Sequence, residues 1–275
     1  MDGSNRACLT LWERSDTVPA SHMRPAAPTN PWFPTRQPNP NARLRVFCFP
    51  FAGGGASVYT GWGAALPAGV ELISVQLPGR ERRIMEPPFR QIPPLLDALE
   101  PVLAPLLDKP FIFFGYSMGT RVALALAQRW KVRGAPMPLG MVMAAAGAPH
   151  RSRDSRDDLD DPAFIELLRK YEGTPAEVFA HKELLDMVLP VLRADFALAD
   201  AVLPAMPVSC PISVFGAHED PHVPLAELEH WRELTTGDFR ARHFPGKHFF
   251  LRTAREPLLA ALREDIVRWC PEVGP

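Results

Sequence analysis

Residues 111–119 read Phe-Ile-Phe-Phe-Gly-Tyr-Ser-Met-Gly, an apolar run that passes into a Gly-x-Ser-x-Gly motif. Four apolar residues in a row, three of them aromatic, predict a buried strand. Residues 120–127 contain good helix formers and recurring apolar positions, which predict a helix. A serine between the two can occupy a strained strand-to-helix turn, because the glycines leave room for a tight backbone.

This position makes Ser117 a candidate nucleophile. The turn would lift the serine hydroxyl clear of the sheet and aim it at the N-terminus of the helix. Free N–H groups and the helix dipole favour a developing negative charge there. The bare five-residue pattern also occurs by chance in loops, where the serine is only structural. Its place between a buried strand and an apolar helix favours the nucleophile.

Length and composition predict one large α/β domain. The chain has 275 residues, of which 47% are hydrophobic and 22% are charged, enough for a sizeable core. The formal net charge of −1 gives no reason to expect binding to nucleic acid or to an anionic membrane. Neither a signal peptide nor a membrane-spanning run is expected.

The cysteines argue against a disulfide framework and against a zinc site. Cys8, Cys48, Cys210 and Cys270 are scattered and form no Cys-x-x-Cys pair. Unpaired cysteines of this kind fit a reducing compartment, so a cytoplasmic protein is expected.

The first 40 residues differ in composition from the rest of the chain. Residues 1–40 are rich in proline and lack sustained periodicity, which predicts a disordered tail. Trp32 and Phe33 are the exceptions, because both can pack onto the surface of the folded domain. That domain is expected to span residues 41–275.

Strand-like and helix-like stretches alternate along the domain. Strands are predicted at 44–50, 70–76, 111–114, 139–146, 211–216 and 239–244, with helices at 91–107, 120–127, 223–234 and 255–269. Strands repeatedly separated by helices predict a mostly parallel central sheet with helices on both faces.

Residues 150–205 break this alternation. They contain no strand pattern, only helical stretches at 164–171, 177–180 and 182–203. The last stretch is apolar well beyond a normal amphipathic face. It can be an ordinary helix packed on the core. The pattern favours a helical lid over residues 150–205, inserted after the sixth strand and lining an apolar channel.

The segment Phe-Ala-Gly-Gly-Gly at residues 51–55 follows the first predicted strand. Consecutive glycines let the backbone pass close to a bound group and point N–H groups at it. A phosphate-binding loop is one interpretation, but the lysine of that motif is missing. An oxyanion-hole loop fits better, because an early loop supplies the second N–H beside the one that follows the nucleophile. For Arg80, in a Pro-Gly-Arg turn after the second strand, a structural turn and a site role both stay open.

A serine nucleophile needs a base, and the base needs an orienting carboxylate. His248 lies in a Pro-Gly-Lys-His loop after the last strand, where it has the freedom to reach the top of the sheet. Asp220 and Glu219 both follow a strand end. Asp220 is preferred, because its Asp-Pro step fixes a turn and its shorter side chain suits an oriented carboxylate. The order Ser117, Asp220, His248 is the one expected of an α/β-hydrolase fold.

From about residue 30 to its C-terminus, the sequence resembles the type II thioesterases, the stand-alone editing enzymes of polyketide and nonribosomal peptide assembly lines. The matching stretches are residues 47–54, 75–80, 115–119, 173–175, 192–196, 216–221 and 246–250. The resemblance implies that Ser117, Asp220 and His248 form the catalytic triad. It also implies that the backbone N–H groups of Ala52 and Met118 form the oxyanion hole.

Two positions depart from the family pattern. Members often have His or Tyr where this chain has Phe51, and often His where it has Tyr116. Neither residue carries the reaction, so the departures bear on acyl preference, and we expect Phe51 and Tyr116 to contact the substrate.

The resemblance implies hydrolysis of acyl thioesters on the phosphopantetheine arm of carrier proteins, which removes aberrant or stalled acyl groups through an acyl-serine. It implies no metal and no bound cofactor, since phosphopantetheine is part of the substrate. The expected partners are acyl or peptidyl carrier protein domains of an antibiotic synthase, with the enzyme as a monomer. Alternatives are the same acyl-enzyme used for acyl transfer, cyclisation or lyase chemistry, or a non-catalytic carrier-protein-binding module.

Overall fold

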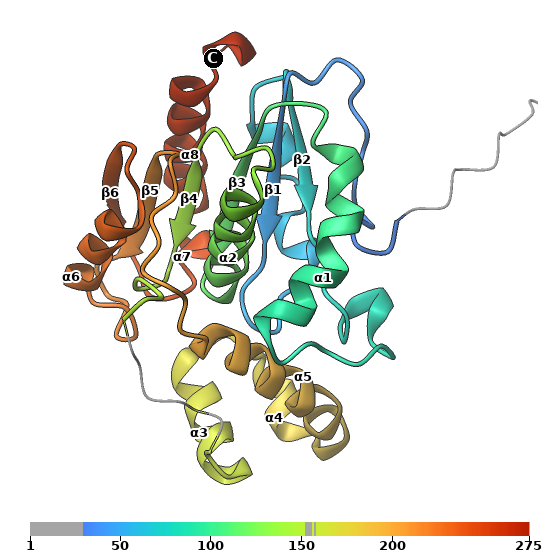
Figure 1. The fold of residues 1–275 in the computed structure, drawn as a ribbon. Helices are drawn as coiled ribbons and strands as arrows, with labels where there is room; N and C mark the ends of the chain where they lie inside the picture. The colour runs from blue at the N-terminus through green and yellow to red at the C-terminus, as the bar shows by residue number, and fades with distance from the viewer. Residues whose placement is uncertain (1–29, 152–155, 157, 275) are drawn as a thin grey trace, which may run out of the picture.

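The computed structural model describes residues 30–151, 156 and 158–274 (Figure 1). Most of the predicted tail, residues 1–29, therefore lies outside the described residues. In its described end, Trp32 and Phe33 are buried in the core of the domain. The carbonyl of Trp32 accepts a hydrogen bond from the Gln76 amide, with an N–O distance of 2.8 Å. The guanidinium of Arg83 lies 4.2 Å from the centre of the Trp32 ring.

The centre of the fold is a six-stranded sheet in the order β2-β1-β3-β4-β5-β6. The strands are β1 Leu44–Phe49, β2 Val70–Ser74, β3 Phe111–Tyr116, β4 Met141–Ala144, β5 Ile212–Ala217 and β6 Phe239–Phe244. All five strand pairs are parallel. The central strands are buried along their whole length, as the continuous apolar runs predict.

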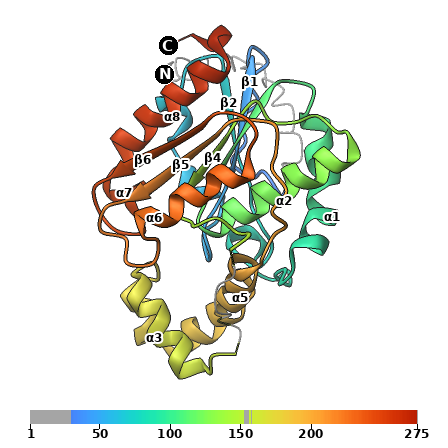
Figure 2. The same ribbon diagram turned by 60° about the vertical axis from the view of Figure 1, so that its left-hand side comes forward.

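Helices cover both faces of the sheet, as predicted (Figures 1 and 2). Successive residues of β3 point to opposite faces, so Phe113 belongs to one apolar cluster while Ile112 and Phe114 belong to another. The first cluster is completed by α1 (Ile92–Leu103), α2 (Met118–Arg133) and α6 (Leu225–Leu228). The second is completed by α7 (Phe250–Thr253) and α8 (Arg255–Trp269).

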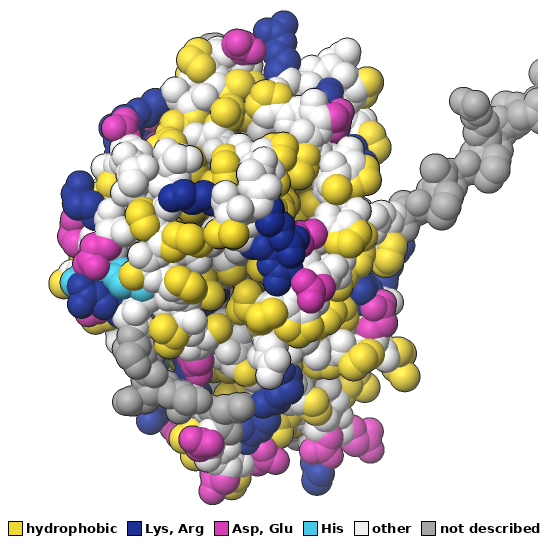
Figure 3. All heavy atoms as spheres, viewed as in Figure 1, with side chains coloured by type: hydrophobic (Ala, Val, Ile, Leu, Met, Phe, Trp, Pro, Cys, Tyr) yellow, Lys and Arg dark blue, Asp and Glu magenta, His cyan; other side chains and the backbone are white. Residues whose placement is uncertain are grey.

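Charges of both signs are mixed on the face that carries α1 and α2 (Figure 3). Arg129 of α2, for example, forms ion pairs with Asp97 and Glu100 of α1, at 2.6 and 3.3 Å. This mixture is in keeping with the net charge of −1.

Three further helices lie beyond the edge of the sheet where its strands end (Figure 1). They are α3 (Asp161–Tyr171), α4 (Ala176–Ala180) and α5 (Lys182–Asp200), close to the three helical stretches predicted. They share a small apolar cluster of their own, made of Phe164, Leu168, Leu189, Leu192 and Phe196.

The predicted position of this helical segment needs a correction. It follows β4, the fourth strand of the described chain, and not the sixth. Residues 30–43, the described residues ahead of β1, form turns and loops and add no strand. Prolines at positions 31, 34, 38 and 40 explain this, because each removes a backbone donor that a strand ladder needs.

The turn from β3 to α2 is packed so closely that two glycines are required. A Cβ on Gly115 would lie 2.7 Å from the Thr120 Cα, and one on Gly119 would lie 2.2 Å from the carbonyl oxygen of Phe49. Both neighbouring atoms belong to the backbone, so moving them aside would cost a large amount of free energy. The two glycines of the motif therefore let α2 start against the end of β1.

Replacing Gly119 with Ala should destabilise the protein, because the added methyl group collides with the backbone of β1. We expect a loss of about 2–3 kcal/mol in the free energy of unfolding, which lowers the melting temperature by roughly 5–10 °C. Gly63→Ala is the matched control, since its Cβ would meet nothing closer than the Leu72 Cβ at 3.9 Å. Thermal melts followed by circular dichroism compare the two. Equal melting temperatures would contradict the packing described.

Candidate active site

Ser117 sits at the turn between β3 and α2 in a backbone conformation that is rare for a residue with a side chain. Its φ is 51° and its ψ is −113°. The surrounding structure holds this strain, because the Ser117 amide donates to the carbonyl of Ala144 at 2.8 Å. The Ser117 carbonyl accepts from the amide of Thr120 at 3.1 Å and from its hydroxyl at 2.7 Å. The side chain thus emerges at the N-terminus of α2, as predicted.

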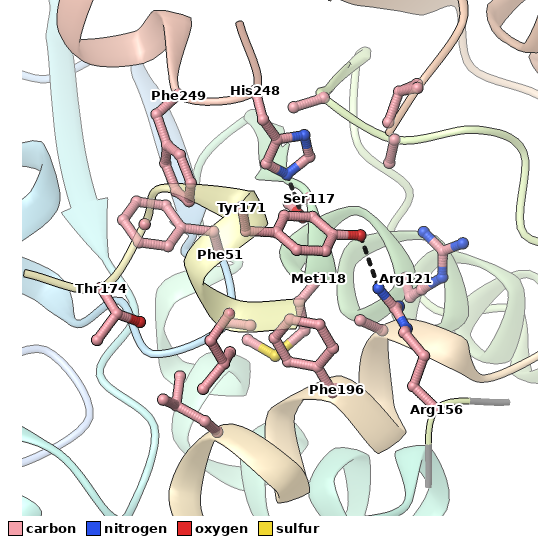
Figure 4. A pocket seen from close by; sticks show the side chains of 18 residues that line it. Phe51, Ser117, Met118, Arg121, Arg156, Tyr171, Thr174, Phe196, His248 and Phe249 are labelled. Carbon is pink, nitrogen blue, oxygen red and sulfur yellow. Dashed lines mark hydrogen bonds between the residues drawn. The ribbon is translucent and has the colours of Figure 1, made fainter. Parts of the chain in front are cut away.

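The loops after β5 and β6 bring Asp220 and His248 to the same edge of the sheet. His248 Nδ1 lies 2.7 Å from Asp220 Oδ2. His248 Nε2 lies 3.1 Å from Ser117 Oγ, the bond drawn as a dashed line in Figure 4. The Asp220 and His248 side chains are only 1% and 5% exposed. The structure therefore joins the three predicted residues in one hydrogen-bonded chain, whereas Glu219 is exposed.

Backbone contacts hold both partners of Ser117. The second carboxylate oxygen of Asp220 accepts from the amide of His222 at 2.8 Å. The carbonyl of His248 accepts from the hydroxyl of Tyr116 at 2.6 Å, and that hydroxyl accepts from the amide of Leu251 at 3.3 Å. Burial raises the pKa of Tyr116 well above its ordinary value, which keeps the phenol protonated and able to donate.

The predicted substrate contact of Tyr116 is therefore wrong. Its side chain is fully buried, and it does not line the cavity at Ser117. The spacing of the motif places Tyr116 one residue before the serine on β3, where its side chain points away from the turn and into the packing below His248. It holds the loop of His248 in place instead.

A narrow cavity of about 50 Å³ lies beside Ser117 and His248. Figure 4 shows Phe51, Phe249 and Thr174 on one side of Ser117 and Arg156 on the other, with the ring of Tyr171 between them and its hydroxyl toward Arg156. Helix α5 contributes Leu192, Phe196 and Ala199 to the wall, and α3 contributes Leu168 and Tyr171. A second hollow, of about 370 Å³, shares Phe51, Ala52, Gly173, Thr174 and Leu192 with the first.

The remaining predicted site residues also line the cavity. Phe51 packs edge-on against Phe249, with ring centres 5.0 Å apart. Ala52 and Met118 lie beside Ser117, and Met118 is the first residue of α2. Among the described residues, nothing accepts a hydrogen bond from the amide of Ala52 or of Met118. Both N–H groups are thus available for an oxyanion, and their role stays a prediction.

Two aromatic neighbours of His248 have no counterpart among the predicted residues. The rings of Tyr171 and His222 are stacked with centres 3.7 Å apart, and each lies within 6 Å of the His248 ring. Burial lowers the pKa of His222 from its ordinary value. A neutral His222 places no like charge beside His248 when that imidazole takes up a proton. No local pattern indicates these contacts, because Tyr171 comes from the separate helical segment.

The family model for the thioesterase domain matches residues 44–267. The chain belongs to the thioesterase family. It is 36% identical over 234 residues to the gramicidin S biosynthesis protein GrsT of Aneurinibacillus migulanus, a match that covers 84% of this chain and 91% of GrsT.

Solved structures agree with this assignment. RedJ, a thioesterase from the prodiginine pathway of Streptomyces coelicolor, is 37% identical, with a TM-score of 0.75 over 85% of this chain and 97% of RedJ. The type II thioesterase BorB from the borrelidin cluster is 31% identical, with a TM-score of 0.73 over 86% of this chain and 96% of BorB. The predicted membership of the type II thioesterases, and with it a thioester hydrolase of α/β-hydrolase fold, is confirmed.

Replacing Asp220 with Asn should leave the fold intact but stop the carboxylate from orienting His248. In serine proteases the same change lowers kcat by about 10⁴, and we expect a loss of that order. Steady-state hydrolysis of an acyl cysteamine thioester measures it. Glu219→Gln, one residue away on an exposed side chain, is the matched control and should change kcat little. The reverse pattern would show that the wrong carboxylate has been assigned.

Proposed function

We propose that this thioesterase hydrolyses acyl thioesters on the phosphopantetheine arm of carrier proteins, and that it removes aberrant or stalled acyl groups there. The observation that carries the proposal is the pair of hydrogen bonds that connects Asp220 to His248 and His248 to Ser117. Ser117 and His248 both line a small cavity. GrsT, RedJ and BorB, which belong to biosynthetic pathways, support the substrate class.

The reaction follows from the positions of these groups. Nε2 of His248 takes the proton of Ser117 as Oγ attacks the thioester carbonyl. The amides of Met118 and Ala52 stabilise the negative charge on the carbonyl oxygen. Collapse expels the pantetheine sulfur, which takes the proton from His248 and leaves an acyl-serine. A water then gives a proton to His248 and attacks the acyl carbon. The bond from that carbon to Ser117 Oγ breaks, Oγ takes the proton back from His248, and the acid is released.

The size of the cavity supports short acyl groups as substrates. The cavity beside Ser117 measures about 50 Å³, against about 370 Å³ for the hollow next to it. Phe51 and Phe249 close one side of this space, and α5 closes another. The larger hollow shares five wall residues with the small one and is the proposed route of the pantetheine arm.

The proposed chemistry uses only side chains and amides of this chain, without a metal or a bound cofactor. The proposed partners are acyl or peptidyl carrier protein domains of a synthase, with which the enzyme acts as a monomer in the cytoplasm. Within the described residues, no helix is long and apolar enough to cross a bilayer.

Two alternative functions are compatible with the same fold and the same triad. The acyl-serine can pass its acyl group to a nucleophile other than water, which would make the enzyme a transferase, cyclase or lyase. A non-catalytic carrier-binding module would need no ordered chain from Asp220 to Ser117, so the geometry favours catalysis over that alternative. Mass spectrometry of the products distinguishes hydrolysis from transfer.

Ser117→Ala should abolish turnover without unfolding the protein. Loss of the serine in a protease triad lowers kcat by about 10⁶, and we expect a comparable loss here. The change removes a hydroxyl that bonds Nε2 of His248 and leaves the rest of the side chain in place, so circular dichroism and the melting temperature should stay close to those of the wild type. More than about a tenth of wild-type activity would contradict a role as nucleophile.

Acyl length should have a modest effect on kcat/KM. We expect acetyl and hexanoyl thioesters to differ by about a few tenfold, because the cavity at Ser117 is small. Burying four more methylenes at about 0.8 kcal/mol each would instead favour hexanoyl by on the order of several hundredfold. Carrier-bound thioesters should outperform the matching cysteamine thioesters, since remote binding contributes to the transition state. A steep rise of kcat/KM with acyl chain length would favour a dedicated chain-release enzyme. Equal kcat/KM for the carrier-bound and the cysteamine thioesters would favour it too.

A further inference from the structure

A buried ion pair connects the helical segment to the loop after β2. Asp195 of α5 and Arg80 are 0% and 6% exposed in their side chains. Arg80 Nη1 lies 2.5 Å from Asp195 Oδ2, and Nη2 lies 2.8 Å from Oδ1. This two-pronged geometry is strong and directional. Burying two charges rarely stabilises a fold more than apolar residues would, so the pair calls for a reason beyond stability.

The third partner of the pair is the loop that carries Ala52. The amide of Gly53 donates to Asp195 Oδ2 at 2.7 Å. Gly53 directly follows Ala52, whose amide is the proposed second donor of the oxyanion hole. Arg80 adds a longer contact to the carbonyl of Gly54, at 3.4 Å. The ion pair thus holds the backbone one peptide away from the amide that must point at the oxyanion.

Neighbouring buried groups hold the rest of the glycine loop. Gln76 Oε1 accepts from the amide of Ala56 at 2.7 Å, while Gln76 Nε2 donates to the carbonyl of Arg80 at 3.0 Å. Arg80 itself is fixed by its Nε and Nη2, which donate to the carbonyl of Pro78 at 3.1 and 3.0 Å. Each polar group in this network has a partner, which makes the network rigid.

Helix α5 also packs directly against the glycine loop, residues 51–55. Gly53 has a φ of +79°, and a Cβ at this position would lie 2.8 Å from Leu192 Cδ2. Leu192 and Asp195 are three residues apart, so they lie on the same face of α5. Leu192 lines the cavity at Ser117 as well. The position of α5 and the position of Ala52 are therefore linked through two adjacent contacts.

We propose that Asp195 and Arg80 are positioning residues that aim the Ala52 amide at the oxyanion, and that they do so only while α5 is seated against the glycine loop. Arg80 also neutralises the negative charge of Asp195. An unbalanced buried carboxylate near the site would oppose the negative charge that develops on the carbonyl oxygen. This inference rests on the proposed acyl-serine function.

The test compares kcat, KM and the affinity for a boronic acid that forms a tetrahedral adduct with Ser117. Asp195→Asn keeps an oxygen for the Gly53 amide but removes the charge that holds Arg80. Loss of one oxyanion donor typically costs 10²–10³ in kcat. We expect kcat and boronate affinity to fall together, by about 10²-fold, with KM changed little.

The matched control is Asp161→Asn, also a change from carboxylate to amide. Asp161 binds Arg193 of α5 at 2.6 Å, and within the part of the chain that the structure describes no ion pair or hydrogen bond joins it to the glycine loop. This variant should keep wild-type kcat. A double variant, Asp195→Leu with Arg80→Met, removes both buried charges and is expected to fold stably. It should still be slow, because the Gly53 amide has lost its acceptor.

Recovery of wild-type kcat and boronate affinity by the double variant would overturn the inference, since the pair would then serve stability alone. Values within about threefold of wild type for a folded Asp195→Asn would overturn it too. Each variant is assayed on an acyl cysteamine thioester and on a p-nitrophenyl ester. A wild type that cleaves only the ester, but loses that activity in Asp195→Asn, would contradict the proposed function and leave the positioning role standing.

Discussion

The strained turn at Ser117 is the constraint on which the site depends. A positive φ of 51° at a serine is held by hydrogen bonds to β4 and to the first turn of α2. The absence of a side chain at Gly119 lets α2 begin against the last residue of β1. The glycine loop at residues 51–55 starts from that same end of β1. The backbone that presents the nucleophile therefore also fixes where the oxyanion loop begins.

The side chains that surround Ser117 are held by partners from other segments. Tyr116 fixes the backbone of His248, the amide of His222 fixes Asp220, and Asp195 fixes Gly53. In each bond one side chain, that of Tyr116, Asp220 or Asp195, is buried, and leaving such a group without its partner costs the full desolvation penalty. The site is consequently ordered before substrate arrives, which is the condition for electrostatic stabilisation of a transition state.

Much of this site could be predicted from the sequence, because its signals are local. The apolar run before Ser117 and the glycines around it define the turn, and the loops after the last two strands carry the acid and the histidine that reach it. The sheet and its covering helices follow from alternating patterns in the same way. The residue range predicted for the helical segment was close, but its placement after a sixth strand was wrong, because four strands precede it in the described chain.

The contacts by which distant segments support the triad and the glycine loop could not be predicted. The direction of Tyr116 depends on packing against the loop of His248, which lies 132 residues away in sequence. Asp195 and Arg80 are 115 residues apart, and their pairing exists only once α5 has docked on the core. The one usable signal was an acid on the apolar stripe of Leu192 and Phe196, because a buried carboxylate requires a cation nearby.

The central claim is that Ser117 carries the acyl group during turnover. The most direct measurement is mass spectrometry of the protein quenched within the first turnovers of an acyl-carrier thioester, followed by mapping of the modified peptide. The account predicts a mass increase equal to the acyl group, located on Ser117 and absent from Ser117→Ala. Hydrolysis at the normal rate with no acylated Ser117, or with the acyl group on another residue, would contradict it.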